Sequence, residues 1–175
     1  MTDHARTHAP DTIRFTIADS SLGRVLVARS ARGLSAVLLG DRDDALERGL
    51  RERFPRATLR QDDVGQSALA AEVTALVESP AGRVDVPLDL RGTEFQRSVW
   101  SALREIPAGE TVSYSEIARR IGRPRSVRAV AGACGANPIA VVVPCHRALG
   151  SDGRLSGYRW GIERKRMLLE REARA

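Results

Sequence analysis

Cys145 and His146 stand side by side in VVVPCHRALG (residues 141–150). A thiol and an imidazole are the side chains that proteins most often combine to make a sulfur nucleophile, because the imidazole takes the thiol proton. Neighbours in sequence usually point in different directions, so we expect a water molecule to connect the two groups. The imidazole then needs an acceptor on its other nitrogen, as in other nucleophile triads.

Glu172 is the candidate for that acceptor. It follows Leu168 and Leu169 by four and three residues and therefore shares their apolar face on a predicted C-terminal helix. A carboxylate on an apolar face is costly unless it is paired. The competing interpretation is a frayed helix end, since only three residues follow Glu172.

Two other residues could support the same chemistry. Asn137 precedes Pro138 and can bond nearby backbone to shape the turn into the VVVPC stretch, or it can simply cap the preceding helix. Tyr114 shares a helix face with Ile117 and Ile121, so core packing is an equal alternative to a role in chemistry.

The elements that position these residues lie in the second half of the chain. Thr93 and Gln96 predict a capping box and a helix to about Ile106. A second capping box over residues 113–116 opens a short helix through Ile121, and a turn over residues 122–124 leads into a third helix, residues 125–135, which completes a helix-turn-helix pattern. Residues 160–172 predict a last helix. The valines before Cys145 indicate a buried strand or core segment.

The helix over residues 125–135 has two different faces. An apolar face contains Val127, Val130, Ala131 and Cys134, so Cys134 is expected to be a core residue. The other face carries Arg125, Arg128, Gly132 and Gly135. Two glycines inside a helix cost about 1 kcal/mol each relative to alanine, which suggests close approach by DNA or by another helix.

The first half of the chain reads differently. Residues 13–19, 24–29 and 33–39 predict a β-meander, and residues 43–53 and 66–79 predict helices. Proline and glycine punctuate residues 80–92. We therefore expect two lobes, residues 1–91 and 92–175.

Composition excludes several classes of protein. Two cysteines cannot build a disulfide scaffold or a four-cysteine zinc site, and a metal site from His4 and His8 in the polar leader is not expected. The N-terminus has no apolar signal core and no stretch is long enough for a membrane span, so we expect a cytoplasmic protein. Residues 91–175 carry 16 basic and 8 acidic side chains, a net charge of +8, against −2 for residues 1–90. This asymmetry favours a polyanion partner, although heavy arginine use can also reflect genome composition.

The motifs taken together resemble the O6-alkylguanine-DNA alkyltransferases. The similar stretches are FQRSVWSALREIPAGETVSY, RSVRAVAGACGANP, VVVPCHR, GYRWG and RKRMLLERE, which span nearly half of the chain. GYRWG and LLERE are most similar to the alkyltransferase half of Ada-type proteins. The first 90 residues match only in general layout.

The resemblance implies an α+β fold with a ribonuclease-H-like N-terminal lobe and a helical, winged-helix-like C-terminal lobe. It implies that Cys145 accepts the alkyl group as a thiolate, that His146 acts through water as its base, and that Glu172 orients the histidine. Asn137 supports the active-site turn. Tyr114 donates toward the guanine as the alkyl group leaves.

The resemblance also implies a DNA face and a base pocket. Arg128 replaces an extruded nucleotide in the stack, and its neighbours on the same helix-turn-helix contact DNA in the minor groove: Arg125, Ser126, Gly132 and Gly135. The pocket is formed by Tyr158, Ala148, Arg159, Val143 and Pro144, with the carbonyls of Cys145 and Ala148 accepting from the guanine amino group. Arg159 stands where many members have a small residue or serine, so a serine hydroxyl contact is lost.

We therefore expect a single-turnover DNA repair protein that needs no cofactor or metal, works as a monomer on double-stranded DNA carrying O6-alkylguanine, and could also accept O4-alkylthymine. The cysteine-rich regulatory region of full Ada proteins is not matched, so transcriptional activation is not expected. Two other hypotheses remain. One is a helix-turn-helix DNA-binding module with an inert cysteine, and the other is a cysteine hydrolase, for which the sequence offers no oxyanion motif.

Overall fold

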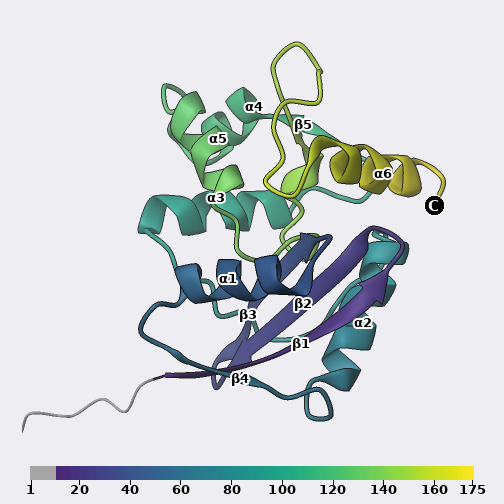
Figure 1. The fold of residues 1–175 in the computed structure, drawn as a ribbon. Helices are drawn as coiled ribbons and strands as arrows, with labels where there is room; N and C mark the ends of the chain where they lie inside the picture. Colours follow the sequence, from purple (N-terminus) through teal and green to yellow (C-terminus); the bar gives the residue numbers. More distant parts are fainter. Residues whose placement is uncertain (1–10) are drawn as a thin grey trace, which may run out of the picture.

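The computed structural model describes residues 11–175, so His4 and His8 lie outside the described residues. A four-stranded sheet forms one side of the molecule, and the helices of the second half lie above it in Figure 1. The predicted mixed α+β class is confirmed.

The sheet begins with the expected β-meander and gains a strand that the sequence did not reveal. Its strands, in the spatial order β3-β2-β1-β4, are β1 (Thr12–Ser20), β2 (Gly23–Ser30), β3 (Gly33–Gly40) and β4 (Thr58–Gln61). β1, β2 and β3 pair antiparallel, whereas β4 runs parallel to β1. β4 was not predicted because it is a four-residue edge strand without buried residues. Its sequence therefore shows no alternation of apolar and polar residues.

Two helices cover the sheet. α1 (Asp43–Arg53) packs against β2 and β3, and α2 (Ser67–Glu78) packs against β1 and β2. Successive strand residues point to opposite faces, yet Val25, Leu26, Val27 and Ala28 are all buried. Both faces of β2 are therefore covered, and this core is the platform on which the second half rests.

The second half is built from four helices. They are α3 (Glu94–Arg104), α4 (Tyr114–Arg120), α5 (Val127–Gly135) and α6 (Ile162–Ala173). The first two begin where the sequence predicts, and the last two begin two residues later than predicted. The predicted start of α5 at Arg125 is wrong by two residues, because the chain still turns there: the amide of Ser126 donates to the carbonyl of Arg123.

The capping predictions are confirmed in one helix and half confirmed in the next. At α3, Thr93 and Gln96 exchange both hydrogen bonds of the capping box. At α4, Ser113 accepts from the amide of Glu116, but the Glu116 carboxylate pairs instead with Arg119 and Arg120. Charged partners one turn away therefore outcompete the backbone amide for that carboxylate.

The stretch that contains Cys145 is a core segment but not a strand. Val37 on β3 donates to the carbonyl of Pro138 at 3.0 Å, and the amide of Ala140 donates back to Val37 at 3.0 Å. The chain then turns tightly, with Val141 at φ 66°, and enters a 3-10 turn at Cys145–Arg147. The edge of the sheet thus anchors the segment that presents the cysteine.

Parallel pairing of two short strands closes this region. β5 (Val112–Ser113) precedes α4, and β6 (Ala148–Leu149) follows the 3-10 turn. This pairing sets the start of α4, where Tyr114 lies, beside the segment that carries Cys145.

Candidate active site

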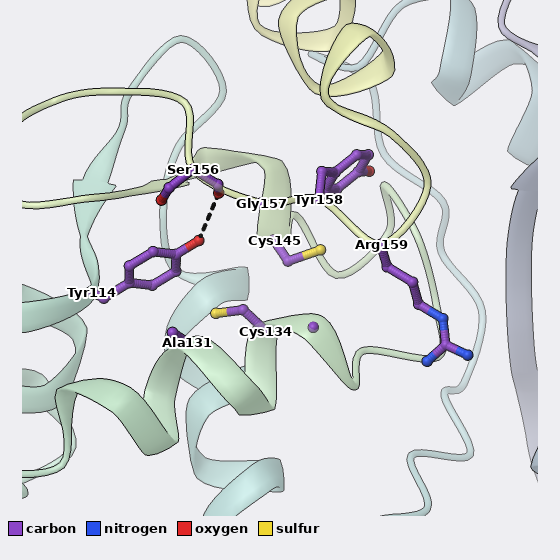
Figure 2. Close-up of a pocket in the computed structure, with 9 residues that line it drawn as sticks. Tyr114, Ala131, Cys134, Cys145, Ser156, Gly157, Tyr158 and Arg159 are labelled. Carbon is purple, nitrogen blue, oxygen red and sulfur yellow. Dashed lines mark hydrogen bonds between the residues drawn. The ribbon is translucent and has the colours of Figure 1, made fainter.

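A pocket of about 310 Å³ opens between α5 and the loop that precedes α6. A volume of this size suits a small ligand. Figure 2 shows that side chains from both elements and from the start of α4 surround the sulfur of Cys145. The lining residues are Tyr114, Ala131, Cys134, Gly135, Cys145, Ser156, Gly157, Tyr158 and Arg159.

Cys145 is a free, buried thiol that is held by Asn137. The Nδ2 of Asn137 donates to the Sγ of Cys145 at 3.2 Å and to the carbonyl of Val143 at 2.8 Å, while its Oδ1 accepts from the amide of Ile139 at 2.9 Å. The fully buried amide therefore bonds both the tight turn and the sulfur. Asn137 therefore does more than cap the preceding helix, because it bonds both the backbone of the turn and the sulfur of Cys145.

The resting sulfur is a thiol at neutral pH. Burial raises the pKa of Cys145 to about 11, against the opposing effects of the Asn137 hydrogen bond and the positive charge of Lys165. A base must therefore remove the proton before the sulfur can act as a strong nucleophile.

His146 has the geometry of that base. Its Nε2 lies 2.7 Å from Oε1 of Glu172, and both side chains are fully buried. Burial lowers the pKa of His146, so the ring is neutral at pH 7. Because the ionised Glu172 can only accept, Nε2 carries the hydrogen and Nδ1 keeps a free lone pair. Nδ1 is buried and has no hydrogen-bond partner within residues 11–175, which leaves it able to receive a proton.

Glu172 is also held by Arg147, a residue to which the sequence assigned no role. The Nε and Nη2 of Arg147 donate to the Glu172 carboxylate at 2.8–3.1 Å, and Nη1 donates to the carbonyl of Ile106 at 2.6 Å. Burial raises the pKa of Glu172, but hydrogen bonds from His146 and Arg147 outweigh that effect and set it at about 2. The position of Arg147 directly after the Cys-His pair was the only signal available in the sequence.

Lys165 is the second residue that sequence reasoning missed. It is fully buried, and its Nζ donates to the carbonyls of Ala148 at 2.6 Å and of Ser156 and Gly157 at 3.3 Å. It therefore joins β6 to the loop that lines the pocket. A signal existed, since Lys165 is the single lysine in a chain rich in arginine.

Tyr114 is half-buried: it packs against the core and also lines the pocket. Its hydroxyl donates to the carbonyl of Ser156 at 3.3 Å, as Figure 2 shows. Burial raises the pKa of Tyr114, which keeps the hydroxyl protonated and able to donate.

Of the expected pocket residues, Tyr158 and Arg159 line the pocket but Val143, Pro144 and Ala148 do not. Tyr158 stacks edge-on against Trp160, with ring centroids 5.3 Å apart. Because the chain turns at Val141 instead of running straight, Val143 is buried behind the sulfur and Pro144 faces a second cavity. The carbonyl of Ala148 accepts from Lys165, and that of Cys145 accepts from the amide of Ala148.

Comparison with known proteins identifies the family. A family model described as "6-O-methylguanine DNA methyltransferase, DNA binding domain" matches residues 94–174. An inducible methylated-DNA–protein-cysteine methyltransferase of Bacillus subtilis is 44% identical over 152 residues, which cover 85% of this chain and 84% of the relative. The chain belongs to the methylated-DNA–protein-cysteine methyltransferases.

Two further relatives resemble this chain over most of its length. The bifunctional transcriptional activator/DNA repair enzyme Ada of Escherichia coli is 51% identical over 161 residues, which cover 92% of this chain but 46% of that protein. The chain thus spans about half the length of the Ada proteins it matches. A crystal structure of Mycobacterium tuberculosis OGT in complex with DNA superposes with a TM-score of 0.77 at 40% identity, over 93% of each chain.

The helix-turn-helix exposes the predicted second face of α5. Arg125, Arg128, Gly132 and Gly135 are exposed, and Ser126 is partly exposed at the N-cap without a side-chain capping bond. A Cβ atom added at Gly132 or Gly135 would meet nothing within 4 Å. Packing against another helix of the described chain therefore does not explain these glycines.

The buried face of α5 differs slightly from the prediction. Val130 and Cys134 are buried as expected, but Val127 and Ala131 are only partly covered, and Ala133 takes a buried position. The reason is Trp100 on α3, whose Nε1 donates to the carbonyl of Ala133 at 2.8 Å. The helix is rotated so that Ala131 faces the pocket.

Two kinds of feature are absent from the described part of the chain. Within residues 11–175, no three side chains of the His, Cys, Asp or Glu type gather as metal ligands would. In the same part of the chain, every helix is too short or too polar to cross a bilayer.

Proposed function

We propose that this chain repairs O6-alkylguanine in DNA by transferring the alkyl group irreversibly to the Sγ of Cys145. One observation carries the proposal: a buried thiol faces a 310 Å³ pocket while the adjacent histidine is held by a carboxylate and keeps a free lone pair. The names of the relatives, which include a methylated-DNA–protein-cysteine methyltransferase and a DNA repair enzyme, support the same reaction.

The reaction begins with proton removal. The thiol proton of Cys145 passes through a bridging water to Nδ1 of His146, and Glu172 stabilises the imidazolium that forms. Asn137 donates to the sulfur and Lys165 supplies a positive charge nearby, so both favour the thiolate at the moment of attack.

The thiolate then attacks the alkyl carbon from the side opposite the guanine oxygen. A sulfur–carbon bond forms, the carbon–O6 bond breaks, and its electron pair stays on the guanine, which takes a proton from Tyr114. The thioether has no good leaving group, so each molecule reacts once and no cofactor is required. O4-alkylthymine presents the same kind of carbon–oxygen bond and is a second candidate substrate.

The base must leave the duplex to reach the buried sulfur, at a cost of a few kcal/mol. We assign Arg128 to the gap left in the stack, and α5 to the minor groove with Arg125, Ser126, Gly132 and Gly135 against the DNA. The exposure of these five residues on one side of the helix-turn-helix supports that assignment. A relative of similar fold is described in complex with DNA.

Several finer predictions belong to this proposal. They are the division into lobes at residues 1–91 and 92–175, a ribonuclease-H-like first lobe, a winged-helix-like second lobe, action as a monomer, and a cytoplasmic location. The sheet elements and α1 and α2 contact chiefly one another, and the helices of the second half contact chiefly one another, which supports the division.

Intact-protein mass spectrometry tests the proposal directly. After incubation with duplex containing one O6-methylguanine, we expect a mass gain of one methyl group, mapped to Cys145, and restored guanine in the DNA. Cys145→Ala should bind the duplex without gaining mass. Repair with unmodified Cys145 would overturn the proposal, and binding without either change would favour the alternative of a DNA-binding module.

A further inference from the structure

Two arginines from distant parts of the chain meet at the C-terminal end of α5. Arg53 is the last residue of α1, and its Nη2 donates to the carbonyl of Ala136 at 3.2 Å. Arg159 lines the mouth of the pocket together with Gly135. Figure 2 shows the Arg159 side chain pointing away from the Sγ of Cys145, so its guanidinium is not engaged with the sulfur.

Neither guanidinium is neutralised by the described part of the protein. Within residues 11–175, the Ala136 carbonyl is the one hydrogen-bond partner of the Arg53 side chain, and its Nε is buried without any partner. No carboxylate in that range lies within 4.0 Å of Arg53 or Arg159. Burial and then the positive charge of Arg159 lower the pKa of Arg53 to about 10. Like charges held this way are costly unless an anion joins them.

Attraction to the negative end of α5 explains only part of this arrangement. A helix C-terminus is equivalent to about half a negative charge, which one guanidinium already exceeds. The Ala136 carbonyl accounts for a single N–H of Arg53 and for none of Arg159. The second cation and the unpartnered Nε therefore need another explanation.

The position of the pair supplies that explanation. Arg128, Gly132 and Gly135 follow one line along α5, because they are separated by four and three residues. Seven residues of helix rise about 10 Å, whereas the minor groove is about 6 Å wide. A helix that crosses that groove at an angle therefore reaches the sugar-phosphate backbone at its end, where Arg53 and Arg159 lie.

We infer that Arg53 and Arg159 together bind one backbone phosphate of the duplex at the C-terminal end of α5. Guanidinium groups match phosphodiester oxygens with paired N–H donors. Within residues 11–175, the Arg159 guanidinium makes no hydrogen bond, and Arg53 uses only its Nη2, for the Ala136 carbonyl. The contact would bring α1, a helix of the sheet platform, into DNA recognition. The inference rests on the proposed function, because it requires α5 to face the duplex.

The salt dependence of duplex binding tests the inference. Each phosphate contact adds about 0.9 to the slope of log K against log salt. We expect Arg53→Gln with Arg159→Gln to reduce the slope by about one unit and to weaken binding about fivefold at 0.15 M salt. Because one phosphate is shared, the losses of the two single variants should sum to more than that of the double variant.

Arg51→Gln is the matched control, since it removes the same charge from an exposed position on the opposite side of α1. Its slope should equal that of the wild type. A scan with single methylphosphonate substitutions should find one position that weakens wild-type binding but not that of the double variant. Three results would overturn the inference. They are a wild-type salt slope in the double variant, a scan that finds no position of this kind, and a loss of about two units of slope in the double variant. Thermal unfolding checks that both variants fold.

The outcome is separable from that of the proposed function. If the wild type gains mass at Cys145 but the double variant keeps the wild-type salt slope, only the phosphate contact is contradicted. If the double variant has a reduced salt slope but the wild type gains no mass, only the alkyl transfer is contradicted.

Discussion

Arg147 and Glu172 form a buried ion pair in which Nη2 lies 2.8 Å from Oε1, and the same carboxylate oxygen accepts from His146. A residue next to the histidine thus holds the group that orients it. The pair joins the 3-10 turn to α6 and, through the Ile106 carbonyl, to the end of α3. The site and the packing of three elements therefore depend on one carboxylate.

Removing Arg147 should destabilise the protein strongly. Arg147→Met leaves the buried Glu172 carboxylate with only His146 and the amide of Gly109 as partners. Breaking a buried ion pair in this way costs about 3–5 kcal/mol. The free energy of unfolding in urea measures the effect. Arg166→Met is the control, since it breaks a largely exposed pair with Glu163 on the same helix and should cost less than about 1 kcal/mol. Equal losses in the two variants would contradict the role of the pair.

The stability of the protein should depend on Glu172 in a defined pH range. Its folded pKa of about 2 lies below its ordinary value of 4.5, so its contribution is complete above pH 4.5 and is lost as the pH falls toward 2. Glu172→Gln should therefore be less stable than the wild type at pH 7 by about 3 kcal/mol. The difference should narrow below pH 4.5. Unfolding in urea at several pH values measures it, and a constant difference would contradict the assignment.

Tyr114→Phe should slow alkyl transfer without unfolding the protein. The variant loses one hydrogen bond of 3.3 Å to the Ser156 carbonyl, but it also loses the proton donor for the departing guanine. Loss of a general acid typically slows a reaction about 100-fold or more. Single-turnover kinetics with methylated duplex gives the rate, and the unfolding temperature gives the control. An alkyl-transfer rate equal to that of the wild type would show that Tyr114 only packs and does not donate a proton.

Arg128→Ala should separate base extrusion from chemistry. Arg128 is exposed on α5 and lines no part of the pocket, so its loss should slow repair of duplex far more than reaction with free O6-benzylguanine. The ratio of the two rate constants is the measurement. Arg48→Ala removes the same charge from the surface of α1 and should leave that ratio unchanged. Equal slowing on both substrates would show that Arg128 does not fill the gap left by the extruded base.

Gly132→Ala should stabilise the free protein and weaken DNA binding. An added Cβ meets nothing within 4 Å, and alanine is favoured over glycine inside a helix by roughly 1 kcal/mol. The same Cβ would stand between α5 and the groove. Unfolding in urea measures the change in stability, and titration with duplex measures the change in DNA affinity. Unchanged binding with raised stability would show that the glycine is not selected for close approach.

Local signals were sufficient for most of the elements. The capping box at Thr93 placed the start of α3, and apolar alternation over residues 13–39 placed three strands. Where a local signal competed with another partner, the prediction was confirmed only in part. Glu116 pairs with Arg119 and Arg120 instead of its cap, and the valines before Cys145 turn because β3 bonds the chain just before them.

The sequence by itself determined the candidate nucleophile, the candidate base beside it, the helix-turn-helix pattern and the family resemblance, because each depends on residues that are close together along the chain. Only the tertiary structure decided that Arg147 shares Glu172 with His146, that Lys165 holds the pocket loop, and that Arg53 reaches the end of α5. These contacts join residues 8 to 83 positions apart. Periodicity and capping rules describe neighbours within a few residues, so no local pattern encodes which distant charge meets which.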